Sequence, residues 1–242
     1  MEIRIDKLLA NHNLATRSEA KKYIKQGLVT VDGIPVKKPE DKVDPTTHVV
    51  AFRGKSIIHK KFVYYMLNKP AGVVTATKDN LHRTVLDLIP NCTSDVFPVG
   101  RLDKDTTGLL LLTNDGDLCH RLMAPKKHVS KVYEAVLDQP INEADIEAFR
   151  CGIDYGEERP AKPAILESVS ELEPFKARVT ITEGKFHQVK RMFHAVGKEV
   201  LFLNRIMVGG LLLDDSLPLG AYRELSDEEV DMLKKLGGAD VI

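Results

Sequence analysis

Apolar residues near the start of the chain repeat with the spacing of a helix. Ile5, Leu8 and Leu9 recur at intervals of one, three and four residues, which predicts a short first helix. Thr16 is followed three residues later by Glu19, the pattern of a capping box, so a second helix is expected to begin there. The chain is therefore predicted to open with two short helices.

Strand signals follow these helices. Residues 28–31 and 34–36 are rich in β-branched side chains and flank Asp32 and Gly33, a pair that favours the tight turn of a two-residue hairpin. Beyond a polar, basic stretch at 53–61, the chain changes to an apolar, aromatic run. We place a domain boundary there and predict a small domain at 1–59 and a larger one at 60–242.

The larger domain is expected to be an α+β structure with a mixed or antiparallel sheet, because its strand and helix patterns do not alternate regularly. Strand-like segments occur at 62–67, 73–77, 109–113, 131–137, 164–169 and 177–182, and helical patterns at 83–89, 142–151 and 187–196. Ser226 with Glu229 three residues later predicts a last capped helix. No internal repeat is visible.

Composition narrows the class of protein. The 242 residues are 43% hydrophobic and 29% charged, as in ordinary globular proteins. No apolar run approaches the roughly 20 residues of a membrane-spanning helix, and the first residues do not have the pattern of a signal peptide. We therefore expect a cytoplasmic protein without a membrane partner. The three cysteines match no zinc-binding spacing and are expected to be free thiols.

The zero net charge conceals an asymmetry. Residues 1–61 hold 13 Lys or Arg against 7 Asp or Glu, and the remainder holds 22 against 28. Within the basic part, Arg17, Lys21 and Lys25 are spaced by four, so they share one face of the second predicted helix. Such a stripe is either an ordinary solvated face or a surface that binds RNA phosphates.

Two polar segments of the larger domain could carry chemistry. Residues 100–108 form a Gly- and Asp-rich turn that leads into a buried strand, which is either a hydrogen-bonded turn or the place where a sheet presents a reactive side chain. Residues 182–194 form a glycine turn followed by a basic helix with Lys190 and Arg191. This second segment is either a solvated helix or an anion-binding site.

Other chemistries have less support. The eight histidines do not occur in metal-binding arrangements, and no glycine-rich nucleotide loop is present, so we expect neither a metal nor a cofactor. One alternative stays open, since Asp103, Asp105 and Thr107 have the spacing of magnesium-dependent phosphatases with an Asp-x-Asp-x-Thr motif. That family needs a buried parallel strand before the motif, and this sequence does not show one there.

Taken together, these segments resemble the pseudouridine synthases, in particular the bacterial branch that modifies ribosomal RNA. The resemblance rests on Gly-Arg-Leu-Asp-x-x-Thr-x-Gly-Leu at 100–109, Lys-x-Tyr at 131–133 and the segment 183–193, in that order. The pattern Leu-Asn-Lys-Pro-x-Gly at 67–72 lies before them, and residues 4–33 resemble an S4 RNA-binding domain.

The resemblance implies roles for individual residues. Asp103 would be the catalytic carboxylate, Lys190 the cation that keeps it ionised, and Tyr133 the ring that stacks on uracil, although an ordinary strand tyrosine would give the same pattern. Expected substrate contacts are Arg101, Arg191, Lys131, Gln188, Leu203 and Ile206, with Arg101 filling the space that the flipped uridine vacates. Expected RNA-backbone contacts are Arg4, Arg17, Lys21, Lys22 and Lys25.

The expected activity is cofactor-free isomerisation of one uridine in 16S rRNA, the 516-type site. The expected partner is that RNA, in a partly assembled small subunit, and the expected state is a monomer. Three alternatives remain: a synthase acting on 23S rRNA, a non-catalytic S4-type assembly factor, and the phosphatase.

Overall fold

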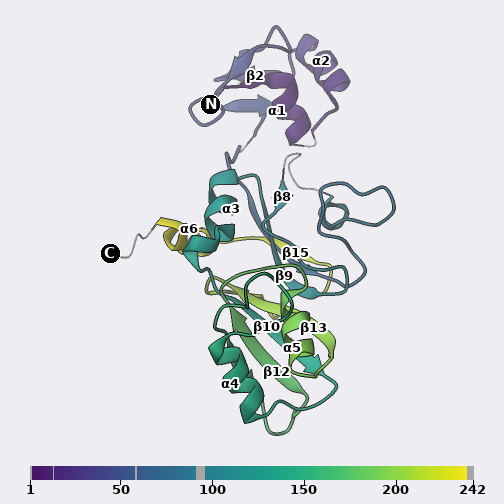
Figure 1. Cartoon of the computed structure of the whole chain (residues 1–242). Coiled ribbons are helices and arrows are strands. Elements are labelled where there is room, and N and C mark those ends of the chain that lie inside the picture. The colour runs from purple at the N-terminus through teal and green to yellow at the C-terminus, as the bar shows by residue number, and fades with distance from the viewer. Residues whose placement is uncertain (1, 13, 58, 91–95, 239–242) are drawn as a thin grey trace. The chain divides into compact units, whose positions relative to one another are not determined.

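The computed structural model describes residues 2–12, 14–57, 59–90 and 96–238. The chain divides into two compact units, the first built mainly from Met1–Val63 and the second from Tyr64–Pro90 with Phe97–Ile242. Figure 1 shows that each unit has its own helices and strands. The functional boundary after residue 59 stays a prediction.

Two helices open the first unit, as the apolar spacing predicts. After the short strand β1 (Ile3–Arg4), α1 spans Ile5–Asn11 and α2 spans Arg17–Lys25. The capping box is confirmed: the Glu19 amide donates to Thr16 Oγ1 at 3.2 Å, and the Thr16 amide donates to the Glu19 carboxylate at 2.8 Å. Ala20 and Ile24 of α2 are buried, so its basic residues face solvent.

Short strands complete this unit. They are β2 (Val29–Val31), β3 (Ile34–Pro35), β4 (Lys42–Val43), β5 (Val50–Phe52) and β6 (Lys55–Ser56). The sheet order is β3-β2-β5-β6, and β1 pairs with β4. The predicted hairpin is confirmed, because Asp32 and Gly33 both have positive φ, at 48° and 81°, which matches the twist of the flanking strands. The core joins Leu8, Leu9 and Ile24 of the helices to Val29 and Val50 of the sheet.

The second unit is built on one mixed sheet. In the described residues it has nine strands, ordered β11-β12-β10-β13-β9-β7-β15, with β14 on β13 and β8 on β9. Their bounds are β7 Tyr64–Lys69, β8 Phe97–Pro98, β9 Thr107–Thr113, β10 Lys131–Leu137, β11 Ile165–Ser168, β12 Lys176–Ile181, β13 Val200–Val208, β14 Leu211–Leu212 and β15 Tyr222–Glu224. Only β9 and β13 pair in parallel among these described strands, so the expected α+β class is confirmed.

Four α-helices are described in this unit: α3 (Gly116–Met123), α4 (Glu143–Cys151), α5 (Gln188–Ala195) and α6 (Asp227–Gly238). The unit also contains two short 3-10 helices: η1 (Val85–Leu88), between β7 and β8, and η2 (Pro125–Lys127), between α3 and β10. Phe149 of α4 and Phe193 of α5 have ring centroids 5.0 Å apart, so both helices cover the same face of the sheet (Figure 1). The box at Ser226 and Glu229 is confirmed at the start of α6.

One predicted strand is wrong. Residues 73–77 do not form a strand, because the backbone of Val74 is bonded within a loop: its amide donates to Arg83 at 3.0 Å, and its carbonyl accepts from Val85 at 3.0 Å. Several described elements are absent from the sequence prediction, among them the helix α3 and the long strand β13. The short helix η1 replaces the longer helical segment predicted at 83–89.

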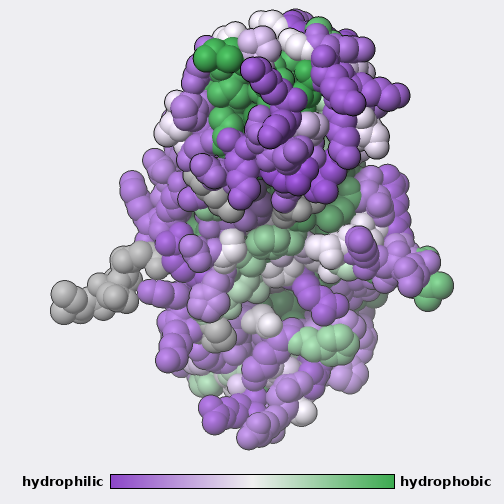
Figure 2. Space-filling view, turned by 90° about the horizontal axis from the view of Figure 1, so that it is seen from above, coloured by the Kyte–Doolittle hydropathy of each residue, from purple (hydrophilic) through white to green (hydrophobic). Residues whose placement is uncertain are grey.

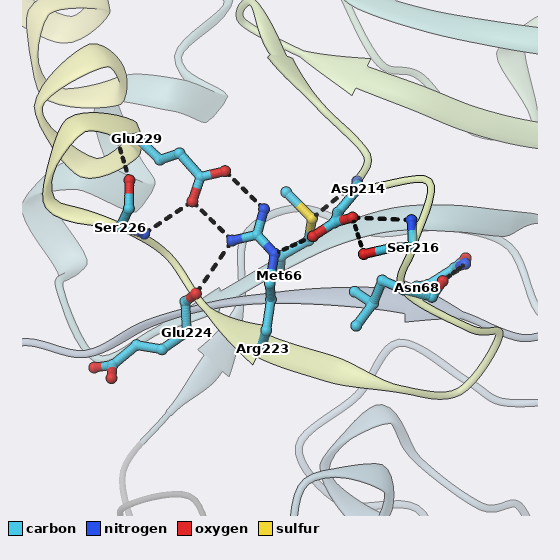
Figure 3. A network of polar contacts seen from close by, with 9 residues as sticks. Met66, Asn68, Asp214, Ser216, Arg223, Glu224, Ser226 and Glu229 are labelled. Atoms are coloured by element: carbon cyan, nitrogen blue, oxygen red, sulfur yellow. Dashed lines mark hydrogen bonds and ion pairs between the residues drawn. The ribbon is translucent and has the colours of Figure 1, made fainter.

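An ionic network anchors the edge of the sheet. Arg223 on β15 donates to Asp214 at 2.6 Å and, through two nitrogens, to Glu229 of α6 at 2.8 Å each (Figure 3). These carboxylates raise the pKa of the guanidinium above its ordinary value, the Glu229 hydrogen bond contributing most. The Asn68 side chain on β7 also donates to the Leu217 carbonyl at 2.8 Å. The end of β7 is therefore held from the side by the 214–224 segment.

One face of the molecule has mainly polar side chains on its surface (Figure 2). Figure 2 shows one face that is largely hydrophilic, with hydrophobic residues gathered in separate areas. Exposed apolar residues include Ile34 and Val49 in the first unit and Phe186 and Leu201 in the second. Throughout the described part of the chain, every helix is too short or too polar to cross a membrane.

Candidate active site

The turn at residues 100–108 lies between β8 and β9 and carries a partly exposed carboxylate. The Thr106 amide closes the turn by donating to the Asp103 carbonyl at 3.1 Å. The side chain of Asp103 is 29% exposed and that of Asp105 is 72% exposed. The turn therefore offers Asp103 to a ligand while keeping much of it away from water.

A buried lysine fixes the backbone of this turn. Lys69, the last residue of β7, has an exposed fraction of 0%, and its ammonium donates to the carbonyls of Asp103 at 3.0 Å and Thr106 at 2.9 Å. The carbonyls of Pro70 and Lys104 accept at 3.1 and 3.3 Å. Burial lowers the pKa of Lys69 to about 8, against the opposing effect of Asp105 and Asp103. The hydrogen bonds of Lys69 thus fix the position of the Asp103 main chain.

Two further contacts hold the turn from either side. The Thr75 hydroxyl donates to the Leu102 carbonyl at 2.7 Å. Gly108 has φ +99°, and a Cβ there would collide with the Arg205 carbonyl oxygen and Asn204 Oδ1 of β13. Glycine is therefore required at position 108, because the turn enters the sheet in close contact with the neighbouring strand.

The cations near the turn are arranged differently from the prediction. Lys190 on α5 donates to both carboxylate oxygens of Asp105 at 2.6 Å, and this pairing lowers the pKa of Asp105. The basic group in contact with Asp103 is His187, with Nε2 3.5 Å from Oδ1. The predicted Lys190 pairing with Asp103 is therefore corrected: in this structure the more exposed carboxylate of the turn takes the lysine.

The predicted tyrosine lies on the same sheet as the strand that the turn enters. Tyr133 on β10 is buried and pairs in register with Arg205 on β13, whose guanidinium carbon is 6.0 Å from the tyrosine ring centroid. Arg205 in turn pairs with Gly108 and donates to the Leu109 carbonyl at 2.8 Å. Directly opposite residues of neighbouring strands share a face, so Tyr133 and Arg205 lie on one face at the level where the turn meets β9.

Three of the predicted substrate contacts, Lys131, Leu203 and Gln188, are buried in the protein. Lys131 is buried, its ammonium donates to the Val129 carbonyl at 2.8 Å, and burial lowers its pKa to about 8. Leu203 is also buried, whereas Ile206 is half-buried, both on β13. Gln188, with an exposed fraction of 3%, donates to Glu183 at 2.6 Å. For Lys131 and Gln188 the structure thus shows internal polar partners in place of an open contact surface.

Arg191 has partners within the protein, whereas Arg101 is exposed to solvent. Arg191 forms an ion pair with Glu157, donates to the Tyr155 carbonyl at 3.1 Å and covers the Tyr155 ring at 4.8 Å, so its charge is used within the protein. Arg101, two residues before Asp103, is exposed. Of the two predicted arginine contacts, Arg101 is therefore the one that an RNA could reach without breaking an ion pair.

Sequence reasoning missed two residues at this site. Lys69 was visible only as part of the pattern at 67–72, where a lysine that ends an apolar strand gives no sign that it is buried. His187 is one of the eight histidines for which the sequence indicates no metal-binding arrangement, and no other role was predicted for it. A signal for it was available, because it directly precedes the helix that carries Lys190 and follows a glycine turn.

The basic residues of the first unit fall into two groups. Arg17, Lys21, Lys22 and Lys25 are exposed on α2. Arg4 is exposed but forms an ion pair with buried Asp6 at 2.7 Å, which lowers the pKa of that carboxyl mainly through the hydrogen bond. The exposed α2 side chains can thus reach an anionic partner, whereas the charge of Arg4 is already paired with Asp6.

The structure gives little support to the phosphatase alternative. The strand that precedes Asp103 is β8, which pairs antiparallel with β9, whereas that motif requires a buried parallel strand. Within the residues described, no three His, Cys, Asp or Glu side chains lie close enough together to hold a metal ion. Cys119 and Cys151 are free thiols, and Cys92 lies outside the described residues.

A carboxylate on a braced turn that leads into an inner strand of a mixed sheet, with an S4-like unit before it in the sequence, defines the class: the chain belongs to the RNA pseudouridylate synthase family. That family matches residues 63–195, and the S4 domain family matches residues 3–49. The protein is therefore an RNA pseudouridine synthase that carries an S4 domain.

Individual relatives are similar over almost the whole chain. An uncharacterised RNA pseudouridine synthase of Bacillus subtilis is 45% identical over 236 residues, covering 96% of this chain and 99% of that protein. Ribosomal small subunit pseudouridine synthase A of Escherichia coli K12 is 40% identical over 231 residues, covering 94% and 98%. A crystal structure described as a pseudouridylate synthase is 37% identical, with a TM-score of 0.66 and coverage of 96% and 99%.

Proposed function

We propose that this protein converts one uridine of 16S rRNA, the 516-type site, to pseudouridine, with Asp103 as the catalytic carboxylate. The observation that carries the proposal is the arrangement at Asp103, a partly exposed carboxylate whose main chain is fixed by buried Lys69. The small-subunit name of the Escherichia coli relative supports the choice of RNA.

The reaction needs no oxidant and no energy donor. The bond between N1 and C1′ breaks, uracil turns, C5 bonds to C1′, and the proton lost from C5 is balanced by one gained at N1. An ionised carboxylate at Asp103 adds to C1′ or to C6 during the rearrangement and is released at the end. The side chain of Asp103 is 29% exposed, and its Oδ1 lies 3.5 Å from His187 Nε2, so the carboxylate can reach a bound nucleotide.

Other side chains have supporting roles in the proposal. Tyr133 stacks on the uracil, and Arg101 fills the space left in the RNA. Lys190 forms an ion pair with Asp105 and so balances the charge of the second carboxylate of the turn. The exposed residues of α2 hold the RNA backbone. In the cell, the protein acts as a cytoplasmic monomer on a partly assembled small subunit.

The test is pseudouridine mapping of unmodified 16S and 23S rRNA, each naked and partly assembled, after incubation with the wild-type protein. Asp103→Asn is the test variant, and Asp117→Asn, an exposed carboxylate on α3, is the matched control. We expect one modified uridine in 16S rRNA with wild type and control, and a rate lower by about 10⁴-fold with Asp103→Asn.

The other outcomes each overturn a stated part of the proposal. A single site in 23S rRNA would keep the chemistry and change the substrate. Retained activity in Asp103→Asn would remove Asp103 as the catalytic carboxylate. RNA binding without pseudouridine in any of the four substrates would favour the assembly-factor alternative.

A further inference from the structure

An exposed aromatic ring lies one residue before the histidine that contacts Asp103. Phe186 is 73% exposed, more than the other exposed phenylalanines of the described residues, Phe175 at 49% and Phe202 at 46%. Its ring stacks on the His187 imidazole, with centroids 3.8 Å apart and planes at 17°. One face of the phenyl ring is thus covered by a second flat ring, and most of its remaining surface is open to solvent.

His187 is held in a strained backbone conformation. Its φ of 48° lies in the left-handed region, which is uncommon for a residue other than glycine and carries a cost that the surrounding structure must offset. From this position its Nε2 lies 3.5 Å from Asp103 Oδ1. The conformation therefore places the stacked pair of rings directly beside the catalytic turn.

The turn that carries the two rings is well supported. The Lys185 amide donates to buried Gln188 at 2.9 Å, and Gln188 donates to Glu183 at 2.6 Å. Arg191 donates to the Phe186 carbonyl at 3.5 Å and is itself anchored on Glu157 and Tyr155. The Phe186 ring is accordingly fixed from the protein side, while its outer face has no protein neighbour in a stacking geometry among the described residues.

A single exposed apolar residue is common on protein surfaces and by itself requires no explanation. Three features together distinguish this one: parallel stacking on histidine, a strained support and contact of that support with Asp103. A flat, exposed ring beside a site that acts on nucleotides is suited to stacking on a nucleobase, because every base has a π-face.

We propose that Phe186, backed by His187, is the stacking platform for the RNA base next to the target uridine. Flipping a uridine disturbs the stacking of the bases beside it, and the phenyl ring stacks on one of these bases from outside the space that Arg101 fills. The stack accepts any base, so it adds affinity with little sequence preference. Because His187 also touches Asp103, occupation of the platform fixes the carboxylate side of the pocket. This inference rests on the proposed RNA-modifying role of Asp103.

The first test is steady-state kinetics of pseudouridine formation in an RNA fragment that the wild-type protein modifies. We compare Phe186→Ala with Phe186→Trp, which keeps a flat ring, and with Phe175→Ala, an exposed phenylalanine of the same unit outside the site. Phe186→Ala is expected to raise KM about 5- to 100-fold. Phe186→Trp and Phe175→Ala should keep KM within about threefold of wild type.

The second test uses the same RNA with 2-aminopurine on either side of the target uridine. Stacking on an aromatic ring quenches this base, so wild type and Phe186→Trp should quench one of the two positions, and Phe186→Ala should not. Unchanged KM and unchanged quenching in Phe186→Ala, with an active wild type, would overturn the platform alone. A wild-type protein that forms no pseudouridine in any RNA would overturn the proposed function and the platform with it.

Discussion

The turn around Asp103 and the exposed face of α2 both carry charge, but they hold it in different ways. At the turn, the Lys69 ammonium is fully buried and bonded to four main-chain carbonyls. On α2, Arg17, Lys21, Lys22 and Lys25 extend into solvent. A buried cation with fixed partners determines geometry, whereas solvated cations supply attraction that is screened by salt and shared among several side chains.

The largest expected effect in this comparison follows from Lys69→Met. Methionine leaves the carbonyls of Asp103 and Thr106 buried without their donor, so the free energy of unfolding should fall by about 2–4 kcal/mol. Displacement of Asp103 should lower kcat by about 100-fold. Urea unfolding and pseudouridine kinetics measure the two losses, with exposed Lys126→Met, outside the turn, as the control. A kcat equal to that of the wild type in Lys69→Met would show that Lys69 does not position Asp103.

A smaller effect is expected from the other buried lysine, as a function of pH. Burial lowers the pKa of Lys131 to about 8 in the folded protein, from an ordinary value of about 10.5. Between these values the unfolded chain binds more protons than the folded one, so stability due to this group rises with pH. Relative to Lys131→Met, the wild-type protein should gain about 1–2 kcal/mol between pH 7.5 and pH 9.5.

Urea unfolding of both proteins at the two pH values measures this difference. Lys126→Met, an exposed lysine of the same unit, is the control and should show no such dependence. A difference between wild type and Lys131→Met that stays constant with pH would mean that Lys131 is protonated alike in both states.

The smallest effect is expected on α2. Lys21→Ala or Lys25→Ala should weaken RNA binding about threefold at 0.1 M salt and reduce the slope of log K against log salt by roughly one. The value of kcat at saturating RNA should not change, since we propose that these residues bind only the RNA backbone. Titrations at several salt concentrations, with Lys235→Ala of α6 as the control, measure the slope. An altered kcat in either α2 variant would contradict the division between geometry and attraction.

The sequence predicted those elements whose signals are local. Thr16 with Glu19, and Asp32 with Gly33, specify a helix start and a turn within four residues, and both are confirmed. The strand predicted at 73–77 is wrong. Its β-branched residues favour an extended backbone, but the Val74 backbone forms hydrogen bonds with Arg83 and Val85 within a loop and does not pair with a strand of the sheet. Helix α3 was missed because its cap, Asp115 before Gly116, looks like a turn.

The site was predictable in its residues more than in its pairings. Motif order brings Asp103 and Lys190 to attention, but spacing cannot decide which of two carboxylates two residues apart receives the lysine. In the structure Asp105 receives it. The burial of Lys69 depends on strands that meet across the sheet, so no pattern near position 69 reveals it. The roles assigned to Tyr133 and Arg101 stay predictions.

The grip of Lys69 on main-chain oxygens has a practical consequence for redesign. Every amino acid supplies the same main-chain carbonyl, so the hydrogen bond from Lys69 to residue 104 does not depend on the side chain at that position. The side chain at that exposed position can be exchanged while the anchor of Asp103 stays in place. Engineering of the turn can therefore vary this side chain without rebuilding the main-chain support of Asp103.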